Sequence, residues 1–537
     1  MCVVRPLQSI GRMTPLDSGH TTSLWAETAD VPTFAPLTAD TRTDVCVIGA
    51  GIAGITTAYL LAKSGKRVIV LDDGPIGGGE TGRTTAHLTY ALDDRFHVLE
   101  QVHGEEGARL AAESHMAAVN RIEQIVKLEK IDCDFTRLDG YLFPSVYRDP
   151  AEIDREYEAA KRAGISDVER LDRAPLPGFT AGPALKFPNQ GQFHILKYLS
   201  GVARAAQAAG AAIHTGDGMH VDRIDDAADG NPCVVGTTSG VTVTCDHVCV
   251  CTNSPISEMV GVHAKEAPYR TYVVAFRIPR GSIPLGLYWD TADPYHYVRL
   301  QQLDERTEPT KGEVLHDVLI VGGEDHKTGQ AHDMDERWRC LEEWTHERFP
   351  TVDEVLYRWS GQVLEPFDFL AFIGRSDGKE RIYEITGDSG HGMTHSTIGA
   401  IILNDIVHGR ENPWAQLYDA RRPVRPASAS VLEFLKENLN VAAQYRDYVT
   451  RGEVGSTDDI PRGEGRVIRR GKHKIAAYKD ESGTLHERSA VCPHLKCIVD
   501  WNPGEKSWDC PCHGSRFDPL GRVLNGPAVS PLGDPPD

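Results

Sequence analysis

Four residues near the C-terminal end of the chain have the types and spacing of a metal site. The pattern is Cys492-x-His494, a span over residues 495–509, and then Cys510-x-x-His513. Thiolate and imidazole groups are good ligands for borderline and soft metal ions. Zinc accepts two cysteines and two histidines, but its usual structural spacing groups like ligands together. Here each half of the pattern holds one cysteine and one histidine, which favours a binuclear iron–sulfur cluster, with zinc or a ligand-free remnant as alternatives.

A [2Fe-2S] cluster of the Rieske type needs this mixed arrangement, because two cysteines bind one iron and two histidines bind the other. The segments CPHLKC (492–497) and CPCHGSRF (510–517) resemble Rieske domains closely. The resemblance also implies that Gly526-Pro527-Ala528 forms a loop that shields the cluster. The implied cluster ligands are Cys492, His494, Cys510 and His513.

Two further cysteines, Cys497 and Cys512, lie in the same two loops. In the respiratory and photosynthetic Rieske proteins that this region resembles, equivalent cysteines form a disulfide between the cluster loops. The resemblance therefore implies a Cys497–Cys512 disulfide. Two free buried thiols are the alternative, since such bridges are uncommon in a reducing compartment.

A glycine pattern at the other end of the chain indicates a dinucleotide site. Gly49-x-Gly51-x-x-Gly54 follows a β-branched run and opens a helix-like segment that ends near residue 62. These glycines permit a tight turn, close approach of a pyrophosphate, and close packing of helix against strand. The helix N-terminus favours phosphate charge. Asp72 ends the next strand, at 67–72, where it is placed to accept hydrogen bonds from ribose hydroxyls.

The sequence after Asp72 favours FAD over NAD. GGGETGRTT (77–85) supplies glycines and hydroxyls where the chain turns back across the cofactor. Roughly the first 415 residues resemble the D-amino-acid oxidase (DAO) family of FAD-dependent amine and amino-acid oxidoreductases, through residues 44–85, 251–253 and 385–394. Motif and resemblance imply the FAD contacts Gly49, Gly51, Ile52, Ala53, Gly54, Asp72, Asp73, Gly79, Thr81, Arg83, Thr84, Thr85, Val221, Thr252, Asn253, Gly387, Gly390, Gly392, Met393 and Thr394.

The resemblance also implies how two of these segments act. ITGDSGHGMT (385–394) brings backbone amides and a helix N-terminus to the flavin ring, where they stabilise negative charge. Val221 holds the adenine through its backbone. His87 lies close by in sequence, but its register matches no covalent flavin attachment.

Residues for substrate binding are expected in the strand-rich stretch LYWDTADPYHYVRL (287–300). An aromatic pocket for a cationic amine is one interpretation; ordinary sheet residues are the other. His391, in the glycine-flanked turn that faces the flavin, is the best single candidate for a catalytic residue, although it could merely contact the cofactor. The candidate substrate or catalytic residues are His391, Tyr297, His296, Tyr288 and Trp289.

Composition limits the possible partners. The chain has 537 residues and a formal net charge of -20, which argues against a nucleic-acid role because phosphate binding needs clustered lysine and arginine. The apolar stretch 45–62 contains the three motif glycines, so we expect a strand, turn and helix in place of a membrane span. With no apolar signal-peptide core at the start, a cytoplasmic location is expected. The sequence does not indicate an oligomeric state.

We therefore expect an α/β FAD-binding (Rossmann-like) domain with an interleaved α+β substrate domain, followed by a small all-β Rieske domain. A helix is expected over residues 427–447, followed by a polar linker. The expected boundaries are 1–43 for an irregular N-terminal arm; 44–97, 186–262 and 361–415 for FAD binding; 98–185 and 263–360 for the substrate domain; 416–463 for helix and linker; and 464–537 for the Rieske domain.

Together the two ends predict a converter between two-electron and one-electron chemistry. In the leading hypothesis an amine or amino acid gives a hydride to FAD, and single electrons then leave through the cluster to an external acceptor. Histidine ligation raises the cluster potential relative to all-cysteine ferredoxins, so the cluster can accept electrons from reduced flavin. The alternatives are an O2-using oxidase with an accessory cluster, a redox sensor or electron-transfer adaptor, and reversed electron flow into the flavin.

Overall fold

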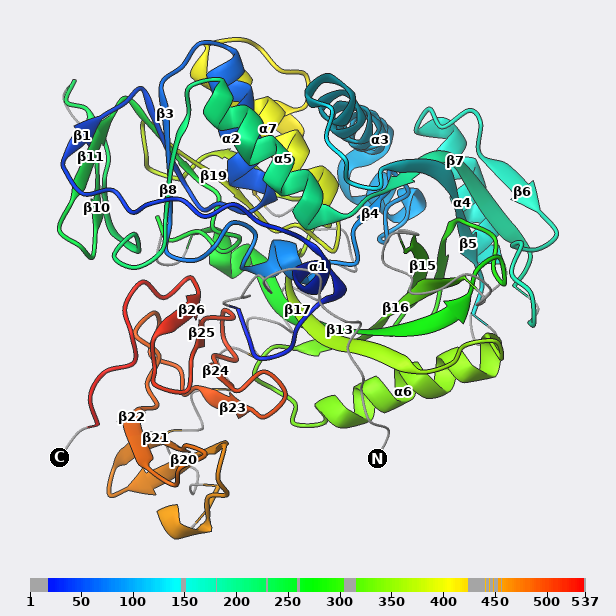
Figure 1. The fold of residues 1–537 in the computed structure, drawn as a ribbon. Coiled ribbons are helices and arrows are strands. Elements are labelled where there is room, and N and C mark those ends of the chain that lie inside the picture. Colours follow the sequence, from blue (N-terminus) through cyan, green and yellow to red (C-terminus); the bar gives the residue numbers. More distant parts are fainter. Residues whose placement is uncertain are drawn as a thin grey trace.

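The computed structural model describes residues 18–535 except 146–150, 180, 228–229, 258–260, 304–314, 424–439, 441–443, 445–447, 449–452 and 455. Most of the helix predicted over 427–447 therefore lies outside the described residues. The described strands form five sheets, and in the view of Figure 1 the two C-terminal sheets lie below the rest of the chain.

A six-stranded, largely parallel sheet carries the glycine motif. Its strand order is β18 (Phe372–Arg375), β19 (Ile382–Thr386), β12 (His247–Val250), β2 (Val45–Ile48), β3 (Val68–Asp72) and β8 (Ala212–Thr215). One face is covered by three helices that lie side by side (Figure 1), α2 (Ile52–Lys63), α5 (Ile195–Ala208) and α7 (Gly392–Val407). Strands β2, β3 and β12 read as continuous buried runs, as expected for parallel strands covered on both faces. The strand, turn and helix predicted at 45–62 are confirmed.

A four-stranded sheet lies next to this one, in the order β1 (Thr41–Arg42), β11 (Thr242–Cys245), β10 (Cys233–Thr237) and β9 (Val221–Asp225). Its core joins the back of β2 and β3, and Cys245 is fully buried there as a small apolar side chain, whereas Cys249 is buried in the core on the other side of the six-stranded sheet. Val221 is the first residue of β9, so this sheet places it beside the end of β3.

A nine-stranded sheet forms the second large layer. Its main path is β17 (Val355–Pro366), β13 (Glu266–Pro279), β16 (His316–Lys327), β15 (His296–Gln302), β14 (Leu287–Asp290), β5 (Thr136–Phe143), β7 (Ala184–Gln192) and β4 (His87–Leu88), and β6 (Glu169–Leu171) pairs with β7. Helix α6 (Met334–Arg348) packs on β13 and β16, while α3 (Phe96–Glu129) packs on α7 and α4 (Ala151–Arg162) packs on α3 and β7. The boundaries predicted at 186 and 361 fall inside β7 and β17, because ladder hydrogen bonds carry both strands into this sheet.

The C-terminal unit contains only strands and short turns among its described residues. A three-stranded sheet comprises β20 (Glu464–Arg470), β21 (His473–Lys479) and β22 (Leu485–Ser489), preceded by η5 (Thr457–Asp459). A four-stranded sheet comprises β23 (Asp500–Asn502), β24 (Ser507–Asp509), β25 (Arg516–Phe517) and β26 (Val523–Asn525). These layers confirm the predicted fold class. In Figure 1 the second sheet is the part of the unit nearer to the rest of the chain.

The described part of the N-terminal arm is more ordered than the sequence predicted. It contains α1 (Leu24–Thr28), with Trp25 fully buried, and the short strand β1. The Trp25 indole donates a hydrogen bond to the carbonyl of Thr84, which explains why a polar, proline-containing segment holds a fixed position. Short elements complete the chain, namely η1 (Glu80–Arg83), η2 (Val262–Lys265) and α8 (Ala415–Tyr418). No helix among the described residues has the length and apolar character needed to cross a bilayer.

Candidate active site and metal centre

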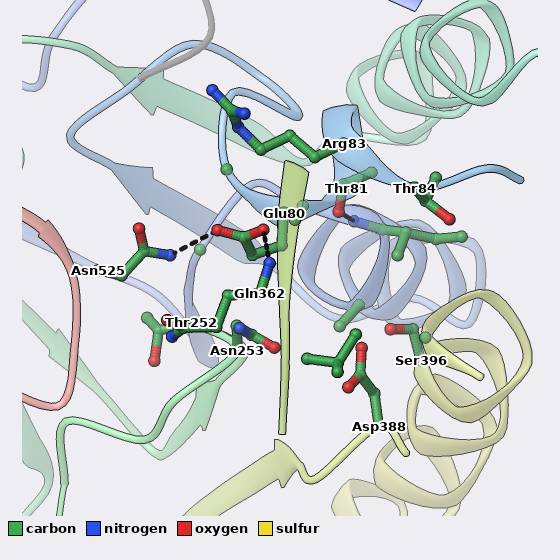
Figure 2. A pocket seen from close by; sticks show the side chains of 18 of the residues that line it. Glu80, Thr81, Arg83, Thr84, Thr252, Asn253, Gln362, Asp388, Ser396 and Asn525 are labelled. Atoms are coloured by element: carbon green, nitrogen blue, oxygen red, sulfur yellow. Dashed lines mark hydrogen bonds between the residues drawn. The ribbon is translucent and has the colours of Figure 1, made fainter. Parts of the chain in front are cut away.

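One long cavity runs between the six-stranded and nine-stranded sheets. Its wall includes the β2–α2 turn, the N-terminus of α7 and side chains from the nine-stranded sheet. Residues 523–526 and Ala528 of the C-terminal unit also line it. Figure 2 shows Asn525 approaching from that unit while Asp388 and Ser396 lie on the opposite side. The cavity therefore touches all the large units of the fold.

The β2–α2 turn leaves room for a phosphate group. Gly49 has φ +103°, and a Cβ there would lie 2.4 Å from the carbonyl oxygen of Cys251. A Cβ on Gly54 would lie 1.8 Å from the carbonyl oxygen of Gly49, so close packing of strand and helix requires this glycine. Helix α2 has no side-chain cap from its own N-cap residue, Gly51; the hydroxyl of Thr81 accepts from the Ile52 amide instead, at 3.1 Å. The helix N-terminus faces the cavity, which suits an anion.

Asp72 is held in place at the end of β3. Its carboxylate accepts backbone hydrogen bonds from Ala50 and from Gly74, the latter at 2.8 Å. A carboxylate can accept about four hydrogen bonds, so these two leave capacity for ribose hydroxyls. Asp73 and Val221 also line this end of the cavity.

The N-terminus of α7 forms the other end. His391 is the N-cap residue, and its Nε2 accepts a hydrogen bond from the Asp93 amide at 2.9 Å. Burial lowers the pKa of His391, with Asp93 opposing the shift, so the ring is neutral near pH 7 with Nε2 as the acceptor. The positive end of the helix dipole is therefore directed at the cavity without a charged histidine.

Most of the predicted cofactor contacts meet in this one cavity. Gly54, Gly387 and Thr394 do not line it, because Gly54 packs on Gly49, Gly387 on Pro366, and Thr394 hydrogen-bonds to His115. The predicted residues on the wall are Gly49, Gly51, Ile52, Ala53, Asp72, Asp73, Gly79, Thr81, Arg83, Thr84, Thr85, Val221, Thr252, Asn253, Gly390, Gly392 and Met393. The glycine cradle at one end and the uncapped helix at the other fit FAD.

Arg83 has a different task from the predicted one. Its guanidinium is fully buried and binds Glu505, 3.1 Å away in the C-terminal unit, together with Ser18, Thr21 and the carbonyl of Ser360. Figure 2 shows the side chain directed away from Asp388 and Ser396. Arg83 therefore joins two units, and its guanidinium is not available to a ligand in the cavity.

The four aromatic and histidine candidates in residues 287–300 divide between two faces of the sheet. Trp289 and Tyr297 pair directly in the β14–β15 register and both line the cavity. Tyr288 stacks on Tyr141 and donates to the Pro284 carbonyl, so it lies on the far face. His296 is also on that face, bound to Asp290 at 3.0 Å and stacked on Trp344. Alternation along a strand allows only one of two neighbours to face inward.

Several cavity residues gave no local sequence signal. Glu80 accepts from the Gln362 amide at 2.6 Å and from Asn525 at 3.2 Å, as Figure 2 shows. At the other end, beside Tyr295 and Tyr297, the wall includes Asp93, Asp325 and Thr271. Burial and the nearby Asp93 raise the pKa of Asp325 to about 7. These residues come from separate strands and loops, and only the folded sheets bring them together.

More carboxyl groups with raised pKa values lie around this end. Burial raises the pKa of Asp388 to about 7, and burial together with Asp93 does the same for Asp94. The pKa of Glu365 is raised well above its usual value by burial and Asp94. The single hydroxyl of Ser389 lies within hydrogen-bond distance of both carboxyls, 3.0 Å from Asp94 and 2.7 Å from Glu365. We call Asp325, Asp388, Asp94 and Glu365 the cavity carboxyls; Asp325 and Asp388 line the cavity, whereas Asp94 and Glu365 lie behind its wall.

The predicted metal ligands come together in two loops of the C-terminal unit. The rings of His494 and His513 have centroids 5.1 Å apart, and Cys492 and Cys510 are buried beside each other. Nδ1 of His513 is buried without a hydrogen-bond partner among the described residues. A buried ring nitrogen without a partner is costly unless it binds something, so this donor set fits a [2Fe-2S] cluster. The disulfide Cys497–Cys512, implied by the resemblance, is present and joins the two loops.

A network of charges holds this unit against the flavin cavity. Three arginines face three carboxyls, and Arg516 binds Asp509 at 3.0 Å and approaches Glu80 at 3.7 Å. Burial raises the pKa of Glu505, but Arg83, Arg270 and Arg516 outweigh this effect and hold it at about 2. We call this set the interface network: Arg83, Arg270, Arg516, Glu80, Glu505 and Asp509.

The cavity and the paired loops define an FAD-dependent oxidoreductase that also carries a Rieske-type iron–sulfur domain. Residues 44–406 match the family of FAD dependent oxidoreductases (DAO), and residues 450–536 match the Rieske [2Fe-2S] domain. The chain belongs to the DAO family of FAD-dependent oxidoreductases, with a Rieske domain at its C-terminal end.

Known proteins are similar to the whole chain or to its FAD-dependent part. The chain is 32% identical over 515 residues to the "Putative Rieske 2Fe-2S iron-sulfur protein YhfW" of Bacillus subtilis, covering 95% of this chain and 96% of the relative. It is 26% identical to the gamma-glutamylputrescine oxidoreductase of Escherichia coli, covering 73% of this chain and 89% of that one. Glycine oxidase from Geobacillus kaustophilus shares the fold, with a TM-score of 0.56, 20% identity and coverage of 71% of this chain and 99% of that one.

Proposed function

We propose that the protein oxidises the C–H bond next to nitrogen in a small amine or amino acid and passes the electrons singly through its Rieske cluster to an external acceptor. When bound, FAD supplies two-electron acceptance and the cluster supplies one-electron transfer. Loss of a hydride from carbon and a proton from nitrogen gives an imine, which water hydrolyses to a carbonyl compound and ammonia or an amine.

The observation that carries the relay is a loop shared by both sites. The amide of Ala528 donates to Oγ of Ser515 at 3.1 Å, inside the CPCHGSRF cluster loop, while Gly526 and Ala528 line the flavin cavity. The predicted shielding loop therefore contacts both the cluster loop and the cavity wall, which supports the relay.

A second short connection runs on the histidine side of the cluster. The ring of His263 lies 5.3 Å from that of His494, and its Nδ1 lies 3.6 Å from Glu266. Thr386, on the cavity wall, donates to Glu266 at 3.2 Å. Both connections run from the cluster loops to residues of the cavity wall, which supports electron transfer between the two sites.

The residues around the reacting end have compatible roles. The aromatic side chains of Trp289, Tyr295 and Tyr297 line this end of the cavity and exclude water. Neutral His391 accepts a hydrogen bond from the Asp93 amide and so holds the segment that leads into α3. The α7 N-terminus favours negative charge at the flavin ring. The oligomeric state does not enter this proposal.

An anaerobic screen tests the oxidation. The purified holoenzyme is mixed with a panel of amines and amino acids, flavin absorbance is followed, and the carbonyl product is identified by mass spectrometry. We expect flavin bleaching and a carbonyl product with at least one compound class. No bleaching with any amine or amino acid would contradict the proposed oxidation, and stoichiometric hydrogen peroxide formation in air would favour the oxidase alternative.

A further inference from the structure

The substrate end of the cavity has an unusual charge pattern. Among its described lining residues, Arg83 is the only arginine or lysine, and its guanidinium is bound to Glu505 and the N-terminal arm. Burial lowers the pKa values of His87 and His391, so neither supplies a positive charge near pH 7. A substrate carboxylate at this end would find no cation to pair with.

Two carboxyls face the same end instead. Asp93 accepts from the Tyr295 hydroxyl at 3.3 Å, and Asp325 lies close enough for Asp93 to raise its pKa. Oδ1 of Asp325 is buried and has no hydrogen-bond partner among the described residues. A buried carboxylate oxygen without a donor is costly, and a positively charged ligand group between the two carboxyls would offset that cost.

Aromatic rings complete the surroundings. The ring centroids of Tyr295 and Tyr297 lie 5.4 Å apart, and the Tyr297 hydroxyl hydrogen-bonds to Thr271 at 2.8 Å. Gly322 makes room for this arrangement, because a Cβ there would lie 2.2 Å from the Tyr297 ring. Ring faces beside carboxylates form a site for an ammonium group.

We propose that the substrate is a di- or polyamine: one nitrogen reacts as the free base, and a second, cationic nitrogen is held by Asp325 and Asp93. This inference rests on the proposed amine oxidation and narrows its substrate class. It excludes a substrate that has a carboxylate in the place of the second nitrogen.

Three compounds with the same reacting end test the inference. 1,4-Diaminobutane, 1-aminobutane and 4-aminobutanoate share the CH2–NH2 group and differ in a cationic, neutral or anionic tail. We expect kcat/KM for flavin reduction to fall in that order, by about tenfold or more at each step, where tenfold corresponds to about 1.4 kcal/mol. Asp325→Asn is expected to lower the diamine value about tenfold and leave the 1-aminobutane value within about twofold.

A binding measurement separates recognition from turnover. Tetramethylammonium has no nitrogen lone pair and cannot form an imine, so its effect on the flavin spectrum reports equilibrium binding alone. We expect Asp325→Asn to raise its Kd about tenfold. Asp94→Asn is the matched control, because Asp94 is a neighbouring buried carboxyl that binds Ser389 and does not line the cavity, and we expect its Kd to stay unchanged.

The outcomes distinguish this inference from the proposed function. A preference for 4-aminobutanoate or for α-amino acids would overturn the diamine inference and leave amine oxidation standing. Tetramethylammonium binding that is unaffected by Asp325→Asn would overturn it too. If no amine reduces the flavin, the proposed function fails, whereas the binding measurement still decides whether Asp325 recognises a cation.

Discussion

The interface network and the cavity carboxyls both contain aspartate and glutamate side chains, yet the pKa values of Glu505 and Asp509 are lowered whereas those of the cavity carboxyls are raised. Arg83, Arg270 and Arg516 hold Glu505 ionised, with a pKa of about 2. Around the cavity, burial and Asp93 raise the pKa of Asp325 to about 7, and Thr271 and Arg337 offset this rise only in part. We infer that Glu505 helps to join the two units because its cations are built into the chain, whereas the charged form of Asp325 is favoured when a cationic ligand binds.

Glu505→Gln should produce the largest effect, because it removes one charge from the interface network. Removing one member of a buried ion network leaves its arginine partners uncompensated, at a cost of about 3 kcal/mol or more. We expect a clear loss of thermal stability in the holoenzyme. Unfolding is monitored by the visible circular dichroism of the cluster. The carboxyl side chain of Glu505 is 1% exposed, so solvent does not screen the loss.

The matched control is Glu487→Gln, which breaks the partly exposed Arg470–Glu487 pair at 2.7 Å. Surface pairs are worth at most about 1 kcal/mol, so this variant should melt close to the wild type. Equal stability of the two variants would show that the interface network does not hold the domain in place.

A fall in pH from 8 to 5 should weaken cation binding at Asp325 and leave the interface network unchanged. Because the pKa of Asp325 is raised to about 7, its charge is present above that pH and is lost as the pH falls through it. Tetramethylammonium affinity should therefore decrease from pH 8 to pH 5, by up to the tenfold that Asp325→Asn removes, and the variant should show a flatter profile. Asp93, Glu324, Arg337, Tyr295, Tyr297 and His391 are the other titratable or charged groups near this carboxyl.

Between pH 8 and pH 5 the charge of Glu505 in the interface network should not change. The pKa of Glu505 is lowered from an unfolded value of about 4.3, so its stabilisation is complete above that pH and disappears only as the pH falls toward about 2. A loss of domain docking between pH 8 and pH 5 would contradict this assignment of charges.

Local spacing made both ends of the molecule predictable. The glycines after β2 and the paired Cys–His loops act within short segments, so residue type and spacing were enough to identify a dinucleotide turn and a Rieske ligand set. The Cys497–Cys512 disulfide followed from the resemblance to Rieske proteins and is present.

The remaining parts depend on contacts between distant segments. Arg83 and Glu505 are separated by 422 positions in the sequence, and neither carries a local sign of the other. Strand alternation separates His296 from its neighbour Tyr297, but only the packing of the sheet decides which of the two meets the cavity. Asp325 went unnoticed because its neighbours in the site, Asp93 and Thr271, come from other parts of the fold.

The central claim is that electrons pass from the flavin site to the cluster within one docked chain. The most direct measurement is anaerobic stopped-flow reduction by a substrate found in the screen, with the cluster followed by its visible absorbance and by freeze-quench electron paramagnetic resonance. We expect cluster reduction to follow flavin bleaching with a rate constant that is unchanged when the protein concentration is raised tenfold. A rate that rises in proportion to protein concentration, or a cluster that stays oxidised while the flavin bleaches, would contradict the claim.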